Sequence, residues 1–98
     1  MKLITKEIQK ILPPLYAQED ISTAKKMVYA KFFTPWSNWT WYVMEYDPKE
    51  KLCFGYVKGF ENELGYFSLE ELENLKGPHG LTIERDLYFK PCKWSEVV

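Results

Sequence analysis

Residues 32–46 read FFTPWSNWTWYVMEY, and this stretch decides the fold. It contains three of the four tryptophans and two of the seven tyrosines of the chain. Strand-favouring residues lie on both sides of positions 35–38, which have the composition of a turn. We therefore expect two strands of a central sheet, one ending at Thr34 and one covering residues 39–47.

The strand at 39–47 carries aromatic rings on both faces, because side chains alternate between the two faces of a strand. One predicted face carries Trp39, Trp41, Val43, Glu45 and Asp47, and the other carries Thr40, Tyr42, Met44 and Tyr46. Such a strand is either central and covered on both sides, or covered on one side and used for binding on the other.

The strand that ends at Thr34 is expected to begin at residue 27, and two further strands are expected after the pair. The type I turn residues at 47–50 predict a hairpin into a third strand at 52–59. Residues 82–90 alternate apolar with polar side chains and predict a fourth strand, which Pro91 ends.

Two glycines, Gly55 and Gly59, interrupt the third predicted strand. Glycine weakens a strand and usually marks a bulge or the close approach of a bulky group. We expect the tryptophans of residues 39–47 to lie over these two glycines.

Two short helices have sequence-defined boundaries. The first follows the N-cap residue Thr5 and ends before Pro13-Pro14. The second begins after Ser68, which has capping-box spacing to Glu71, and Gly77-Pro78 is expected to supply a left-handed C-cap and a stop. The apolar stripe of the first helix consists of Ile4, Ile8, Ile11 and Leu12.

Residues 17–26 are polar and without periodicity, so we interpret them as a surface loop. A chain of 98 residues can bury only one core. The elements together predict a single α+β domain of residues 1–98. Its mainly antiparallel, four-stranded twisted sheet is a meander of three strands plus one more, and the two short helices cover one face.

The composition argues against several classes of protein. The net charge is −1, with 13 basic and 14 acidic side chains interspersed along the chain, which disfavours a basic nucleic-acid groove and an acidic DNA mimic. Cys53 and Cys92 are far apart and the chain has one histidine, so we expect reduced, packed thiols, no zinc site and no cofactor. Because no signal peptide or membrane span is evident, we expect a cytoplasmic protein without a membrane partner.

Three tryptophans, Trp36, Trp39 and Trp41, are candidates for a binding surface. Each ring offers a flat apolar face that could stack on a base, a sugar or a peptide. The alternative is that Trp39 and Trp41 belong to the core and that Trp36, in the turn, packs over them. Trp36 is expected to be the most exposed of the three.

Arg85 is a further candidate. If Ile83, Leu87 and Phe89 face the core, Arg85 points inward as well, and a buried guanidinium needs a carboxylate partner or a bound anion. A structural ion pair and a ligand contact both satisfy this need. The partners that we consider for the ion pair are Glu45, Asp47 and Glu61.

No residue pattern predicts a catalytic or metal site. The single histidine, His79, is expected to be exposed in a loop, and it has no companion that would make a nucleophile system. Alternating carboxylates are usually solvated, so their spacing is weak evidence for a magnesium-type site. The carboxylates in question are Glu45, Asp47, Glu61, Glu63, Glu84 and Asp86.

Four segments resemble a small bacterial family that is described only as a domain of unknown function. They read LPPLYAQED (12–20), KFFTPWSNWTWYVMEYD (31–47), FGYVKGFENELGYFSLEEL (54–72) and IERDLYFKP (83–91). Members of that family are often encoded on plasmids, conjugative elements and prophages, sometimes joined to larger proteins that handle DNA. The resemblance implies this setting and supplies no catalytic residues.

We favour a non-enzymatic binding or adaptor module that engages a protein partner through an aromatic surface, within a mobile-element DNA-processing complex. The second hypothesis is a weak single-stranded nucleic-acid binder that stacks bases on Trp36, Trp39 and Tyr56. The third is an enzyme with a cleft that unites Arg85 with carboxylates. In the nucleic-acid hypothesis, the cations near the stacking residues would be Lys31, Lys58 and Arg85. We expect a monomer or a homodimer.

Overall fold

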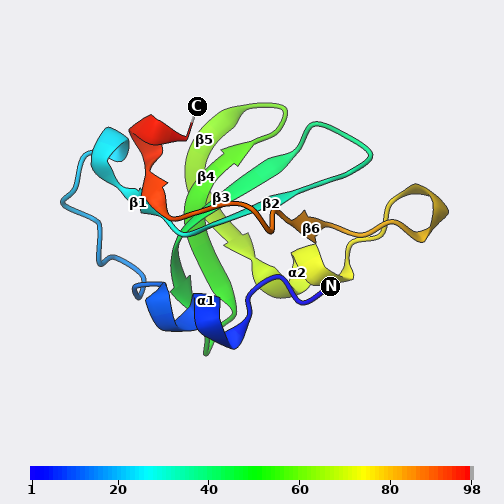
Figure 1. Ribbon diagram of the computed structural model, residues 1–98, viewed down its shortest axis with the longest axis horizontal. Coiled ribbons are helices and arrows are strands. Elements are labelled where there is room, and N and C mark those ends of the chain that lie inside the picture. The colour runs from blue at the N-terminus through cyan, green and yellow to red at the C-terminus, as the bar shows by residue number, and fades with distance from the viewer. Residues whose placement is uncertain (98) are drawn as a thin grey trace.

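The computed structural model describes residues 1–97 and has the predicted α+β architecture (Figure 1). Five antiparallel strands form the main sheet in the order β5-β4-β3-β2-β6, and a small second sheet pairs β1 with β7. The aromatic stretch supplies the central strand, β3, as expected. The strands are β1 (Met27–Val28), β2 (Ala30–Phe33), β3 (Thr40–Asp47), β4 (Leu52–Lys58), β5 (Asn62–Ser68), β6 (Glu84–Arg85) and β7 (Cys92–Lys93).

Two α-helices begin at the predicted caps. In α1 (Lys6–Ile11) the Thr5 hydroxyl accepts a hydrogen bond from the Ile8 N–H at 3.2 Å, and in α2 (Leu69–Asn74) the Ser68 hydroxyl accepts one from the Glu71 N–H at 3.2 Å. These side chains pair N–H groups that the first turn of a helix leaves free. Three 3₁₀ turns complete the structure: η1 (Thr23–Lys25), η2 (Pro78–Gly80) and η3 (Trp94–Glu96).

The prediction of a left-handed C-cap at Gly77 was wrong. Helix α2 ends at Leu75 in an extended conformation, and Gly77 has φ −97°. Glycine is needed there because an added Cβ would lie 2.4 Å from the Trp36 ring. The left-handed residues of this loop are His79 and Gly80, with φ of 57° and 76°.

Each face of the main sheet has its own apolar cluster, so β3 is covered on both sides. On the helix face, Trp41, Val43 and Cys53 pack against apolar residues that flank α1 and belong to α2. On the C-terminal face, Tyr42 and Met44 are covered by the end of the chain, including Trp94. Figure 1 shows the two helices on the same side of the sheet and the C-terminal turn on the other. Neither helix in residues 1–97 has the length and apolarity that crossing a bilayer requires.

A β-bulge at Met44 overturns the predicted alternation in β3. Val43 pairs with Gly55 but Glu45 pairs with Phe54, so the register shifts between them. An extra residue turns every later side chain to the opposite face. Glu45 therefore leaves the face of Trp41, and Tyr46 joins it.

The first and fourth predicted strands are shorter than expected. Residues 27–34 divide into β1 and β2 because β1 pairs with β7, whereas β2 pairs with β3. Residues 82–90 contribute only β6. Asp86 ends it by a turn in which its carboxylate accepts a hydrogen bond from the Tyr88 N–H at 2.9 Å, which competes with further strand pairing.

The main sheet has one strand more than predicted, namely β5. Its sequence, NELGYFS, lacks clear alternation and contains the poor strand formers Asn, Glu and Gly. Its continuous pairing with β4, from Leu52 opposite Ser68 to Lys58 opposite Asn62, arises from the hairpin between them. Because β5 is an edge strand, its sequence carries no strong apolar pattern.

The segment 17–26 is not wholly a surface loop. Gln18 and Lys26 are buried, and the Glu45 carboxylate accepts hydrogen bonds from the N–H groups of Tyr16 and Gln18, both at 2.8 Å. The side-chain amide of Gln18 in turn donates a hydrogen bond to the Met27 oxygen and accepts one from the Met27 N–H. A buried carboxylate is stabilised by such donors, and here it fixes the loop to β3.

The expectation for the two strand glycines was half right. An added Cβ at Gly59 would lie 2.3 Å from the Trp39 ring, so a tryptophan does lie over this glycine. At Gly55 the nearest atom is the backbone oxygen of Tyr42. Backbone crowding beside the bulge, and no tryptophan, therefore requires glycine at 55.

Candidate functional site

The sheet separates the predicted aromatic residues into two groups. Trp36, Trp39 and Trp41 belong to the cluster on the helix face. Tyr56 lies on the C-terminal face, where its ring stacks on Trp94 at 4.0 Å between centroids. The structure therefore does not bring Tyr56 together with the tryptophans in one stacking surface.

A row of rings runs from the core to the solvent on the helix face. Trp41 is 6% exposed, Trp39 stacks on it at 5.7 Å with an interplanar angle of 26°, and Phe60 meets Trp39 edge-on at 5.4 Å. Phe60 is 95% exposed. The most exposed ring of the row is thus Phe60, whereas Trp36 is half-buried against Gly77.

Arg85 does not form the predicted ion pair in the described part of the chain. Its Nη1 donates hydrogen bonds to the backbone oxygens of Lys2 at 2.6 Å and Leu3 at 2.9 Å, and its backbone N–H donates to the Met1 sulfur at 3.2 Å. The guanidinium therefore ties the amino terminus to β6. The expectation of a buried guanidinium was wrong, because the strand ends at Arg85 and Leu87 is exposed; Arg85 is half-buried and contacts carbonyls in place of a carboxylate.

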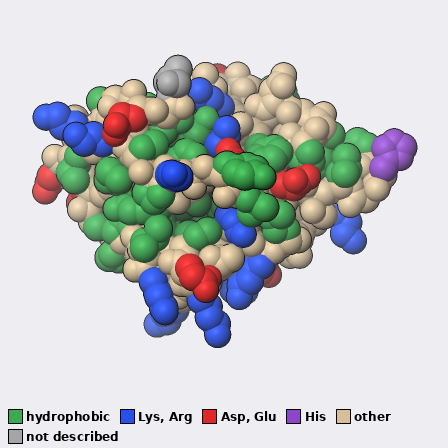
Figure 2. Space-filling model, in the orientation of Figure 1, with side chains coloured by type: hydrophobic (Ala, Val, Ile, Leu, Met, Phe, Trp, Pro, Cys, Tyr) green, Lys and Arg blue, Asp and Glu red, His purple; other side chains and the backbone are tan. Residues whose placement is uncertain are grey.

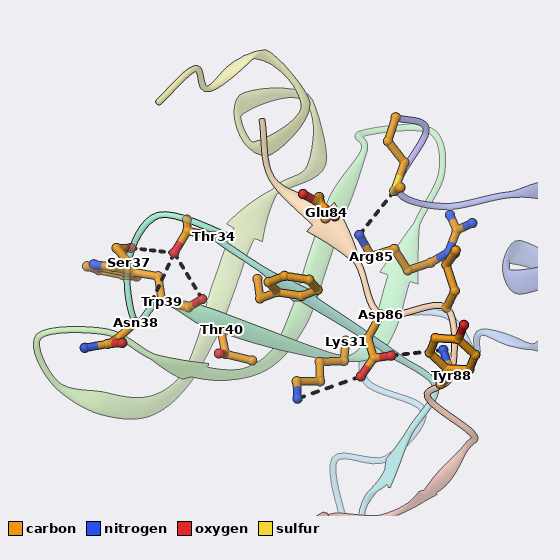
Figure 3. A pocket seen from close by; sticks show the side chains of 13 residues that line it. Lys31, Thr34, Ser37, Asn38, Trp39, Thr40, Glu84, Arg85, Asp86 and Tyr88 are labelled. Atoms are coloured by element: carbon orange, nitrogen blue, oxygen red, sulfur yellow. Dashed lines mark hydrogen bonds and ion pairs between the residues drawn. The ribbon is translucent and has the colours of Figure 1, made fainter. Parts of the chain in front are cut away.

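A hollow of about 600 Å3 lies at the β6 end of the sheet and is called the β6 groove. Its walls come from β2, from the turn before β3 and from β6 (Figure 3). It unites two predicted residues, Trp39 and Arg85. The residues that define it are Lys31, Phe33, Thr34, Trp39, Arg85 and Asp86.

Several polar groups of the β6 groove are already paired. Lys31 Nζ lies 3.9 Å from the Asp86 carboxylate, the hydroxyls of Thr34 and Ser37 share a hydrogen bond, and Arg85 Nη1 is held by the backbone oxygens of Lys2 and Leu3. Figure 3 shows Lys31 pointing toward Asp86 while Arg85 points away to the amino terminus. Both cations of the groove therefore already have partners within the protein.

A second hollow, of about 450 Å3, lies on the helix face between the aromatic row and β5 and is called the β5 groove. Trp39 lines both grooves and separates them. The floor is open at Gly65, where an added Cβ would have no atom within 4 Å. The residues that define this groove are Trp39, Trp41, Val57, Phe60, Gly65 and Phe67, with Glu61 and Glu63 at its rim.

The sequence interpretation missed the outer part of the β5 groove. The sequence around Phe60 could have indicated an exposed ring, since a large side chain between Gly59 and Glu61 at a hairpin tip is too far from the core to be buried. Val57, Gly65 and Phe67 have no such signal. The pairing of β3 with β4 places Val57 opposite Trp41, and the pairing of β4 with β5 adds Gly65 and Phe67 to the same face.

An apolar cleft of about 280 Å3 also lies between α1 and the segment 85–91. Figure 2 shows hydrophobic side chains gathered on this face of the molecule. Arg85 and Asp86, of opposite charge, lie at its rim. The same view shows the single histidine, His79, exposed at one end of the molecule, as expected.

Neither cysteine is positioned as an activated nucleophile. Burial, with a smaller contribution from Glu73, raises the pKa of Cys53 to about 12, so its thiol stays protonated near neutral pH. Burial, with a smaller contribution from Glu96, also raises the pKa of Cys92. Both thiols are free.

Acidic residues do not assemble into a metal site in residues 1–97, where no group of three or more His, Cys, Asp or Glu side chains could hold an ion. Glu45 is 3% exposed and bonded to the loop described above. Glu61 and Glu63 are exposed at the β5 groove. The carboxylates that the sequence grouped as weak metal candidates are thus distributed over separate parts of the molecule.

Comparisons with known proteins agree with the resemblance that the sequence showed. Neither the curated proteins nor the solved structures include a match to this chain. The model of one family, described as protein of unknown function (DUF2958), matches residues 3–95. The match covers almost all of the sequence, including both grooves, and the chain therefore belongs to the DUF2958 family.

Proposed function

We propose that the protein is a non-enzymatic binding module that engages a protein partner through the β5 groove. The observation that carries the proposal is the exposure of Phe60, which is 95% exposed although its ring rests on Trp39. Burying such a ring in an interface contributes roughly 1.5–3 kcal/mol. Aromatic residues beside a hollow of this kind are the usual anchors of protein interfaces.

The chemistry of the titratable groups supports a non-enzymatic role. The two thiols have raised pKa values, whereas a nucleophilic cysteine needs a lowered one. Arg85 is held by two backbone carbonyls, and Lys31 is held by Asp86. An enzyme would need such groups free in one cleft to act on a substrate.

The setting that we propose is the cytoplasm, in complexes that process the DNA of mobile elements. Free thiols at Cys53 and Cys92 fit a reducing compartment. The mobile-element role rests on the family resemblance alone.

Nucleic acid is the second candidate partner, because the β6 groove unites Trp39 with Lys31 and Arg85. Against it, both cations already have partners: a phosphate would compete with Asp86 for Lys31, and Nη1 of Arg85 is occupied by two backbone oxygens. Tryptophan fluorescence titrated with single-stranded DNA at low and moderate salt separates the candidates. Salt-dependent quenching would favour nucleic acid, and an unchanged signal would favour protein.

Site-specific crosslinking tests the proposal directly. A photoreactive benzoylphenylalanine replaces Phe60 in one variant and Tyr88 in another, both expressed in the native host. Tyr88 is 92% exposed and lies outside the β5 groove, so it is the matched control. We expect a discrete protein adduct from position 60 and none of the same mass from position 88. Equal adducts from both positions, or no adduct from 60, would contradict the proposal.

A further inference from the structure

Within residues 1–97, no strand pairs with the outer edge of β5. The strand has seven residues, stands at the end of the sheet and pairs without a bulge to β4 on one side only. Natural sheets usually blunt such edges with proline, a bulge or a covering segment. Strand β5 contains neither proline nor a bulge.

The hydrogen-bond pattern identifies which backbone groups point outward. At the two ends of the hairpin the Gly59 N–H donates to the Glu61 oxygen at 3.2 Å, and the Leu69 N–H donates to the Lys51 oxygen at 2.9 Å. With the register of β4 and β5, these bonds assign the odd-numbered residues of β5 to the side of β4. The N–H and C=O groups of Asn62, Leu64 and Tyr66 therefore point away from the sheet. Within residues 1–97 they have no hydrogen-bond partner in another element.

The β5 groove lies directly beside this edge. A strand added to β5 would place alternate side chains on the helix face, where the floor is open at Gly65 and the walls are Trp39, Phe60 and Phe67. The free edge supplies backbone hydrogen bonds, and the groove supplies pockets for side chains. These are the two requirements of recognition by strand addition.

The charge of the β5 groove indicates which side chains a partner would carry. Glu61 and Glu63 are exposed at the rim, and no Lys or Arg is among the described residues that line it. The face of an exposed ring such as Phe60 also attracts a cation. The acidic rim and the aromatic wall of the β5 groove are both complementary to the side chains of Lys or Arg.

We infer that β5 accepts an extended segment of a partner protein as a sixth strand, and that this segment carries Lys or Arg at alternate positions. The inference rests on the proposed function and names the chemistry of the partner. A second copy of this chain is a less suitable occupant, because pairing β5 with β5 would bring two sets of Glu61 and Glu63 together without a cation.

The test uses the full chain and defined peptides with blocked termini. The probe is an octapeptide of alternating Val and Lys, and its charge control has Glu in place of Lys. Amide hydrogen exchange followed by NMR reports the result. On saturation with the probe we expect slower exchange at the outward amides of Asn62, Leu64 and Tyr66, because outward amides gain a partner whereas those facing β4 already have one.

A backbone control separates strand addition from simple adsorption of charge. The same Val-Lys octapeptide with every amide N-methylated keeps its side chains, but its methyl groups keep its backbone from approaching the edge of β5 closely enough for its carbonyls to accept hydrogen bonds. We expect it not to protect the three amides. We also expect the Glu octapeptide to bind about tenfold more weakly than the Lys octapeptide, as for two reversed surface charge contacts. Equal binding of either control would overturn the inference.

Three variants, one of them a charge control, keep the test independent of a folding defect. Glu61→Lys/Glu63→Lys should invert the preference, so that the Glu octapeptide binds more tightly, whereas Glu50→Lys, in the exposed turn between β3 and β4, should not. Gly65→Leu should block binding by filling the open floor. An unchanged preference in the double variant would overturn the inference.

The outcomes distinguish this inference from the proposed function. If crosslinking at Phe60 yields a protein and the basic octapeptide fails, strand addition is wrong and the binding module stands. If both fail, both are wrong. If the free protein is a dimer whose Asn62, Leu64 and Tyr66 amides are already protected, the occupant is a second copy and the inference is wrong.

Discussion

The two grooves beside Trp39 differ in what their side chains already contact. In the β6 groove the cations Lys31 and Arg85 are held by Asp86 and by backbone oxygens. In the β5 groove Glu61 and Glu63 are exposed, and no cation of the described chain lines it. The cations of the larger groove therefore already have partners, whereas the acidic groups of the smaller groove face solvent. Volume by itself does not identify a binding site.

The largest effect that sharpens this comparison is expected at Gly59, because Trp39 rests on this glycine and separates the grooves. An added Cβ would lie 2.3 Å from the ring, so Gly59→Ala should lower the free energy of unfolding by about 1–3 kcal/mol. Gly65→Ala is the matched control. Its added Cβ has no atom within 4 Å, and we expect a change within about 0.5 kcal/mol. Urea denaturation measures both, and equal losses would contradict the role given to Trp39.

A somewhat smaller loss of stability is expected when the guanidinium of Arg85 is removed from the β6 groove. Arg85→Met removes two hydrogen bonds to the oxygens of Lys2 and Leu3 and should cost about 1–2 kcal/mol of stability. The counterpart in the β5 groove is Glu63→Gln, for which we expect almost no change because the carboxylate is exposed. Thermal unfolding of the two variants compares the grooves. A large loss in Glu63→Gln would show that this carboxylate has a structural partner.

The Lys31–Asp86 pair should give a small, salt-sensitive coupling. Its side chains are about one-third exposed, so a double-mutant cycle with Lys31→Met and Asp86→Asn should yield about 0.2–1 kcal/mol. The coupling should shrink in about 1 M salt, where charges are screened within ~3 Å. A cycle on Glu61 and Glu63 should show no attraction. Absence of coupling between Lys31 and Asp86 would mean that the cations of the β6 groove are available to ligands.

The smallest effect on stability is expected at Phe60. Because its side chain is almost fully exposed, Phe60→Ser should change the free energy of unfolding by less than about 0.5 kcal/mol. The same change should weaken binding of the Val-Lys octapeptide about tenfold, since an anchor ring is lost. Tyr88→Ser should leave that binding unchanged. Calorimetry with the three proteins tests this, and intact binding by Phe60→Ser would remove the aromatic row from the interface.

The parts of the fold that sequence predicted correctly depend on contacts between near neighbours. Thr5 and Ser68 cap their helices within three residues, and the turn residues at 47–50 join two strands. The parts that it missed depend on distant contacts. Strand β5 forms because it pairs with β4 in a hairpin, although its residues favour a strand only weakly. Strand β1 is separate from β2 because it pairs with β7.

The candidate site was predicted in part for the same reason. Trp39 and Trp41 were found because they are large rings in a clear strand, and Arg85 because it interrupts an apolar alternation. Phe60 and Gly65 were missed, since their importance depends on which strand lies beside Trp39. Tyr56 was grouped with the tryptophans although the sheet places it on the opposite face.

The α+β class, the place of the aromatic stretch in the main sheet, the helix starts and the glycine beneath Trp39 could all be predicted from the sequence. Local propensity, capping and the size of the rings are sufficient for these. Tertiary structure decided the face of Glu45, the partner of Arg85 and the free edge of β5. These depend on a bulge of one residue at Met44 and on pairings between strands distant in the chain. Period-two alternation contains no information on where a bulge falls, because its position is fixed by packing on both faces of the finished sheet.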